Sequence, residues 1–144
     1  MDTFNHNLKV ILADSFTLFY QNRHVHWNMR DERFYFLHRM IEEQTDSLHE
    51  FIDVLAERIR QKNDFAPKNL HDLMNMKTLK EPSQVKNGSE MLKELIVSYR
   101  HVLISLHELM DISAKNNDLV TQDILIEYAR FIEKTIWILE SHQN

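Results

Sequence analysis

The sequence contains no cysteine, only one glycine and only two prolines among its 144 residues. The absence of cysteine excludes disulfides, thiolate zinc sites and iron–sulfur clusters, and it is typical of proteins from a reducing cytosol. The scarcity of glycine and proline argues against turn-rich β architectures and favours long helices. No segment is apolar enough to span a membrane, and MDTFNHNLKV at the N-terminus lacks the basic and apolar regions of a secretory signal. We therefore expect a cytoplasmic helical protein with no membrane segment.

Length and charge set further limits on the class of protein. A chain of this length, with 43% hydrophobic residues, is expected to form one domain over residues 1–144 with a well-buried core. The formal net charge of −5 argues against non-specific binding to nucleic acid, whose phosphates attract basic proteins.

Four long segments have the apolar spacing of amphipathic helices. They run from about residue 4 to 29, 32 to 61, 85 to 114, and from after 117 to near the C-terminus. Both prolines and the glycine lie between the second and third segments, where a short helix also fits at residues 69–76. Asp118 and Thr121 are candidate N-caps of the last helix. This pattern predicts an all-α, ferritin-like four-helix bundle with a short extra helix in its long middle connection.

The stretch RHVHWNMRDERFYFLH, residues 23–38, concentrates histidines at the junction of the first two helices. The second helix then carries two candidate ligand pairs at i,i+4 spacing, namely His38 with Glu42 and Asp53 with Glu57. These four residues lie within about 100° of one another around the helix and outside its apolar stripe. Such a polar face is often simply solvated, but imidazole and carboxylate groups together also suit iron or zinc better than calcium.

The two pairs are too far apart to share one ion within a single chain. His38 and Asp53 are 15 positions apart, which is about 22 Å along a helix. Two copies of the helix packed antiparallel across a two-fold axis would bring the pairs together, and such an interface forms its site twice. His26, near the end of the first helix, would add a second imidazole. The predicted site therefore combines His26, His38 and Glu42 of one chain with Asp53 and Glu57 of its neighbour.

A di-iron site inside the bundle is disfavoured. Such sites use Glu-x-x-His motifs that project into the core. This motif does not occur in the chain, and the nearest spacing is Asp46 to His49. Because the core stripes of all four helices are apolar, full-sized ferritin chemistry is the weaker alternative.

The motifs resemble those of the Dps family, the bacterial mini-ferritins. HVHWNMRDERFYFLHRMIEE followed by FIDVLAERI carries the family's His-Trp, Phe, Leu-His and Asp-x-x-x-Glu elements, the last in an Ala-Glu-Arg context. DLVTQDILIEYARFIEKTIWILES is similar to the family's last helix, so the resemblance covers nearly the whole chain. The chain departs from the family at Asp31, where glycine is frequent, and in having no lysine-rich N-terminal tail. Because Asp tolerates unusual backbone angles, we expect a modified turn there.

The resemblance implies a cytoplasmic bacterial ferroxidase. Dps proteins form hollow dodecamers that oxidise Fe(II), preferably with hydrogen peroxide, and store the ferric product as a mineral, which protects the cell from oxidative stress. Their ferroxidase centres lie between two-fold-related subunits. The centres use the positions that are here His26, His38, Glu42, Asp53 and Glu57, with iron bound and zinc as an alternative occupant.

Acidic residues at the start of the last helix line pores through which iron enters in Dps relatives. The matching positions here are Asp118, Asp123 and Glu127. Carboxylates in a first helical turn also stabilise the helix dipole, so capping is the alternative interpretation.

Two other classes of function are weighed against the ferroxidase. The first is a nucleoid-associated protein that shields DNA physically, which the negative charge and the missing basic tail disfavour. The second is a structural or adhesion-type assembly without oxidation chemistry, which the presence of all five ligand positions disfavours. The leading hypothesis is a homo-oligomeric ferroxidase that acts on Fe(II) and hydrogen peroxide.

Overall fold

The computed structural model of the chain describes residues 3–82 and 87–143. The helices in these ranges are α1 Thr3–Asn28, α2 Phe34–Gln61, α3 Leu70–Met76, α4 Gly88–Lys115 and α5 Leu119–Glu140. The predicted helices are confirmed, with ends within two residues of the expected ones. The exception is the start of α4, because its expected position near residue 85 lies outside the described ranges. None of the helices in these ranges is long and apolar enough to cross a membrane.

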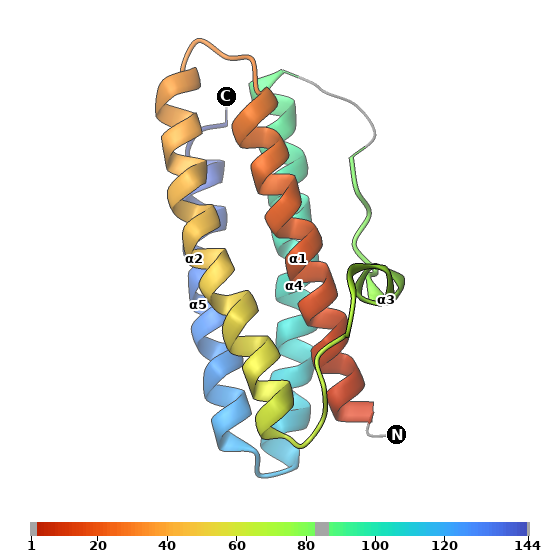
Figure 1. The fold of residues 1–144 in the computed structure, drawn as a ribbon. Coiled ribbons are helices and arrows are strands. Elements are labelled where there is room, and N and C mark those ends of the chain that lie inside the picture. Colours follow the sequence, from red (N-terminus) through yellow and green to blue (C-terminus); the bar gives the residue numbers. More distant parts are fainter. Residues whose placement is uncertain (1–2, 83–86, 144) are drawn as a thin grey trace.

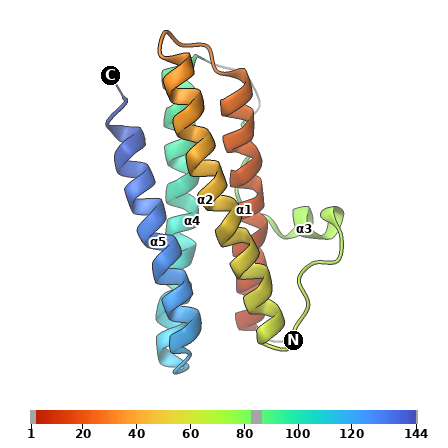
Figure 2. The same ribbon diagram turned by 60° about the vertical axis from the view of Figure 1, so that its left-hand side comes forward.

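The four long helices form a bundle with one long crossover. α1 and α2 are joined by a short turn at one end, and α4 and α5 by another at the opposite end (Figure 1). The connection that carries α3 joins opposite ends of the bundle, so that α2 and α4 run in the same direction (Figures 1 and 2). α1 packs on α2 and α4, while α5 packs on α4 and α2. The predicted ferritin-like crossover is therefore confirmed.

The core consists of apolar side chains at helical spacing on each long helix. On α2 the fully buried residues are Leu37, Ile41, Leu48, Leu55 and Ile59. Two fully buried tyrosines complete the core, and each has a partner for its hydroxyl. The Tyr99 hydroxyl donates to Asn22 Oδ1 at 3.1 Å, and the Tyr128 hydroxyl donates to Ser15 Oγ at 2.7 Å. Burial raises the pKa of both phenols, so both stay protonated.

A buried carboxylate that sequence reasoning passed over holds the long connection against the bundle. Asp14 on α1 is fully buried and accepts hydrogen bonds from Thr78 N at 2.6 Å, Thr78 Oγ1 at 2.6 Å and Leu79 N at 2.8 Å. The Thr78 hydroxyl donates its proton to Asp14. Thr78 Oγ1 must therefore accept the 2.8 Å hydrogen bond from Nε2 of His101 on α4. Asp14 thereby joins α1, the connection and α4.

Candidate metal centre

His26 and His38 face each other across the turn that joins α1 to α2. Their rings stack with centroids 3.6 Å apart and planes 13° from parallel. His26 Nδ1 lies 2.8 Å from the His38 carbonyl oxygen, and His38 Nδ1 lies 2.7 Å from the His26 carbonyl oxygen. Because a carbonyl oxygen only accepts, each Nδ1 carries a proton, and in the neutral ring this tautomer leaves the lone pair on Nε2. Both imidazoles are thus set in the tautomer that binds a metal through Nε2.

The surroundings of the two rings differ. His26, in the last turn of α1, is only 4% exposed, whereas His38, in the second turn of α2, is half-buried. Phe34 stacks on His38 with ring centroids 5.0 Å apart, which restricts the more accessible ring. The structure therefore brings together the two histidines that the sequence places in one half-site, and it holds them in a fixed orientation.

The carboxylate candidates lie along α2. Glu42, one turn beyond His38, is exposed, as are Asp53 and Glu57 further along the helix. Their exposure agrees with the expectation that the ligand face is not the core face. In the described part of a single chain, no three His, Asp or Glu side chains are placed to hold a metal together. The histidine end and the carboxylate end of α2 are therefore separate within one chain, and the shared site stays a prediction.

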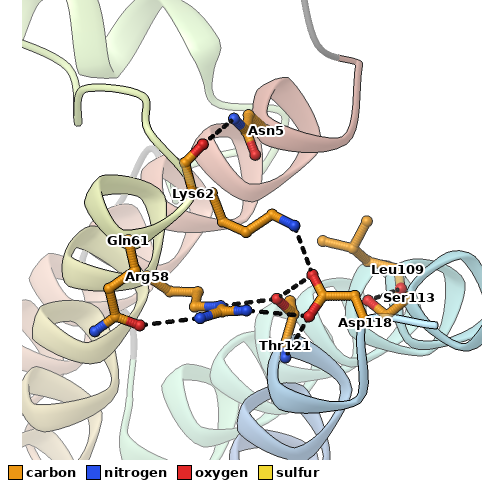
Figure 3. A network of polar contacts seen from close by, with 8 residues as sticks. All are labelled: Asn5, Arg58, Gln61, Lys62, Leu109, Ser113, Asp118 and Thr121. Atoms are coloured by element: carbon orange, nitrogen blue, oxygen red, sulfur yellow. Dashed lines mark hydrogen bonds and ion pairs between the residues drawn. The ribbon is translucent and has the colours of Figure 1, made fainter. Parts of the chain in front are cut away.

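Asp118, one of the three candidate pore residues, is the N-cap of α5 and the centre of a polar network (Figure 3). Its carboxylate accepts from Thr121 N at 3.1 Å and Thr121 Oγ1 at 2.6 Å, and it forms ion pairs with Arg58 at 3.0 Å and Lys62 at 2.9 Å. Burial of the carboxyl raises its pKa, but the hydrogen bonds from Thr121 and Lys62 outweigh burial and hold the pKa well below its ordinary value. Both oxygens are engaged, which favours capping over pore lining for this residue.

The same network ties the carboxylate end of α2 to α5. Arg58, which directly follows Glu57, also donates from Nε to Thr121 Oγ1 at 2.9 Å and from Nη1 to Gln61 Oε1 at 3.0 Å (Figure 3). In the sequence, this arginine stands out only as part of the Ala-Glu-Arg motif. Its structural partner lies 60 positions away, a separation at which no local pattern signals a contact.

The other two pore candidates are available at the surface. Asp123 and Glu127 are both exposed on α5, and Glu127 Oε1 is 3.5 Å from Arg130 Nη1. Leu119 and Val120, in the first turn of α5, are 64% and 59% exposed. A pore would need further chains around this surface, so the pore assignment of Asp123 and Glu127 stays a prediction.

The turn at Asp31 is built by its side chain rather than by unusual backbone angles. Among the described non-glycine residues, a positive φ occurs only at Asn63 and Asn117. The Asp31 carboxylate instead accepts from Arg33 N at 2.8 Å, Arg33 Nε at 2.9 Å and Arg33 Nη2 at 3.0 Å. These hydrogen bonds, the side-chain ones first, lower the pKa of Asp31. The turn does not use the tolerance of Asp for unusual backbone angles, and a carboxylate–guanidinium fork shapes it instead.

Comparisons with known proteins place the chain in a family. Residues 5–144 match the ferritin-like domain family. The DNA protection during starvation protein of Helicobacter pylori strain J99 is 29% identical over 136 residues, which is 94% of each chain. Dps from Vibrio cholerae O1, described as a member of a superfamily of ferritin-like di-iron-carboxylate proteins, superposes with a TM-score of 0.91 at 24% identity, over 96% of this chain and 87% of that one. Dps from Listeria innocua soaked with zinc has a TM-score of 0.91 at 21% identity, over 96% of this chain and 94% of that one. The resemblance of the motifs is confirmed, and the chain belongs to the ferritin-like family as a protein of the Dps type.

Proposed function

We propose that this protein is a ferroxidase and iron-storage mini-ferritin, which oxidises Fe(II), preferably with hydrogen peroxide, and keeps the ferric product inside a hollow dodecameric shell. The observation that carries the proposal is the His26–His38 pair. Backbone carbonyls accept both Nδ1 hydrogen bonds, which leaves both Nε2 atoms free for a metal, and Glu42 follows His38 by one turn of α2.

Iron is the substrate of the proposed reaction. Neutral imidazole nitrogens bind Fe(II), while carboxylates also favour the harder Fe(III) product. Two Fe(II) ions each lose one electron, hydrogen peroxide accepts both electrons, its O–O bond breaks, and two hydroxide ions form. Because both electrons reach one peroxide molecule, no hydroxyl radical is released. Zinc, which prefers the same nitrogen and carboxylate ligands, would compete for the site without being oxidised.

The second ligand set is proposed to come from a neighbouring chain. Asp53 and Glu57 are exposed at the other end of the same helix face. An antiparallel two-fold contact between α2 helices would place them opposite His38 and Glu42 of the partner, and it would do so twice. This arrangement explains why one chain presents two incomplete sets of ligands.

A second candidate function is protection of DNA by direct binding, because the Helicobacter pylori relative is named for DNA protection. The net charge of −5 per chain opposes contact with phosphates. Removal of Fe(II) and peroxide would protect DNA without contact, so the ferroxidase is the preferred candidate.

A mixing experiment tests the shared site. His38→Ala and Asp53→Ala chains are each expected to oxidise Fe(II) slowly, as followed by ferric absorbance after peroxide is added to anaerobically loaded protein. When the two are co-assembled in equal amounts, one site in each mixed pair has all its ligands, so about one quarter of wild-type activity should return if pairing is random.

The matched control is a mixture of His26→Ala with His38→Ala. Both changes lie in the same half-site, so no mixed pair contains an intact site and no activity should return. The shared-site model fails if the first mixture stays inactive, or if the control mixture recovers equally well.

A further inference from the structure

The end of the bundle that carries His26 and His38 is also where α4 begins (Figure 1). The turn between α1 and α2 lies directly against this start. Arg30 and Asn87 form an isolated bridge, and Gly88 N donates to the Arg30 carbonyl oxygen at 3.0 Å. The backbone of the turn is therefore fixed to the first residue of α4.

The Asp31–Arg33 fork holds the same turn from its other side. Arg33 is the N-cap residue of α2 and makes no side-chain capping hydrogen bond, while its own backbone N–H donates to the Asp31 carboxylate. Arg33 Nη1 also donates to the His142 carbonyl oxygen at 2.8 Å, which links the start of α2 to the segment after α5. The turn is thus held by α4, by its own fork and by the C-terminal segment.

Gly88, the only glycine in the chain, lies where α4 approaches the turn between α1 and α2 most closely. A Cβ atom added to it would overlap Asp31 Oδ2, and it would lie 2.7 Å from Asp31 Cβ and 2.9 Å from Asp31 Cγ. Such separations are too short for carbon atoms that are not bonded, whose optimum is about 3.5–4.0 Å. Gly88 does not have a positive φ. The requirement for glycine therefore comes from the neighbouring side chain and not from the local backbone.

We propose that Gly88 and Asp31 form a matched pair that positions the His26 and His38 imidazoles. Each imidazole donates to the backbone of the other residue, so both hydrogen bonds depend on the separation between the end of α1 and the start of α2. Residues 29–33 set that separation, and the pair holds these residues in place. Gly88 and Asp31 are positioning residues, since neither is proposed to touch the metal. The metal that the histidines bind rests on the proposed function, whereas the positioning does not.

The test compares Gly88→Ala in two backgrounds, the wild-type chain and Asp31→Gly. With Asp31 present, the new methyl group must displace the turn. We expect about a tenfold loss of Zn(II) affinity, the effect typical of groups that orient metal ligands, and faster backbone hydrogen exchange in residues 26–38. In the Asp31→Gly background the clash is gone, so Gly88→Ala should change neither quantity. Ser89→Ala, one position along α4, is the matched control and should leave both unchanged.

The pairing is overturned if Gly88→Ala has equal effects in the two backgrounds, or no effect in either. If the single variant does not assemble, recovery of assembly by Asp31→Gly/Gly88→Ala supports the pairing, and continued failure contradicts it. Absence of Zn(II) binding and Fe(II) oxidation in the wild-type protein would overturn the proposed function instead. Hydrogen exchange would still decide whether the pair positions the turn.

Discussion

Replacement of Asp118 by Ala should lower the free energy of unfolding by about 3 kcal/mol. Loss of the N-cap accounts for about 1 kcal/mol. Arg58, whose side chain is 14% exposed, loses a charged hydrogen-bond partner, which costs about 1.5 kcal/mol. Lys62, at 29% exposure, is better solvated and adds about 0.5 kcal/mol. For a chain of this size the total corresponds to a fall of about 6–12 °C in the thermal midpoint.

Asp118→Asn separates the cap from the charge. Asparagine caps helices as well as aspartate does, so this variant should lose only about 2 kcal/mol. Midpoints of thermal and urea unfolding, read by circular dichroism on assembled protein, measure both changes. Asp123→Ala, an exposed acid in the same helix, is the control and should shift the midpoint little. A change below about 1 kcal/mol in Asp118→Ala would refute the reasoning, because the cap alone accounts for that amount.

The network should also give stability a defined dependence on pH. The pKa of Asp118 is lower in the folded chain than in the unfolded chain, where it is about 3.9. The unfolded state therefore binds the proton more readily, and the stabilisation is fully present above the unfolded pKa and is lost at lower pH. The difference in unfolding free energy between wild type and Asp118→Asn should be constant above about pH 5 and shrink below about pH 4. A constant difference down to about pH 3 would contradict the ion pairs.

Three further predictions concern iron uptake, DNA and the long connection. Asp123→Asn with Glu127→Gln should slow iron uptake at low Fe(II) without affecting assembly, because carboxylates concentrate cations electrostatically; unchanged uptake would contradict a role for both residues in iron entry. The wild-type protein should not shift duplex DNA in a gel at pH 7.5 and about 0.15 M salt, and a tight complex there would contradict the charge argument. Asp14→Ala should destabilise the fold by about 3 kcal/mol, because the backbone N–H groups of Thr78 and buried Leu79 lose a charged acceptor. Faster proteolysis of the connection would show this, and an unchanged digestion pattern would count against it.

The fold was predictable because the helices follow simple rules. The spacing of apolar residues is enough to predict each long helix, and few glycines or prolines interrupt the pattern. On α2, residue counting places the buried stripe on one side and Glu42, Asp53 and Glu57 outside it, as the structure does. The proximity of His26 and His38 was expected, but their reciprocal hydrogen bonds were not, because these depend on the exact course of the turn.

Features that depend on distant contacts were not predictable. Both capping and pore lining were open for Asp118 from the sequence, and its ion pairs with Arg58 on α2 and with Lys62, directly after α2, favour capping. The role of Asp14 was not predicted, because its partners Thr78 and Leu79 are distant in the sequence. An acidic residue at a core position of a helix nevertheless indicates that the carboxylate must have polar partners. The reason for glycine at position 88 is the Asp31 side chain, which lies 57 positions earlier in the chain. No local pattern reports such a separation.

The acceptors at the histidine pair are main-chain oxygens, which every amino acid possesses. Replacement of either histidine therefore leaves the other with its acceptor in place and its proton on the same nitrogen. A chain with one of the two would retain a single ligand already prepared for metal, rather than a collapsed site. Replacing one histidine should therefore lower metal affinity in part, and replacing both should lower it further. During evolution, the second imidazole could be lost or regained without any change in how the first one is held.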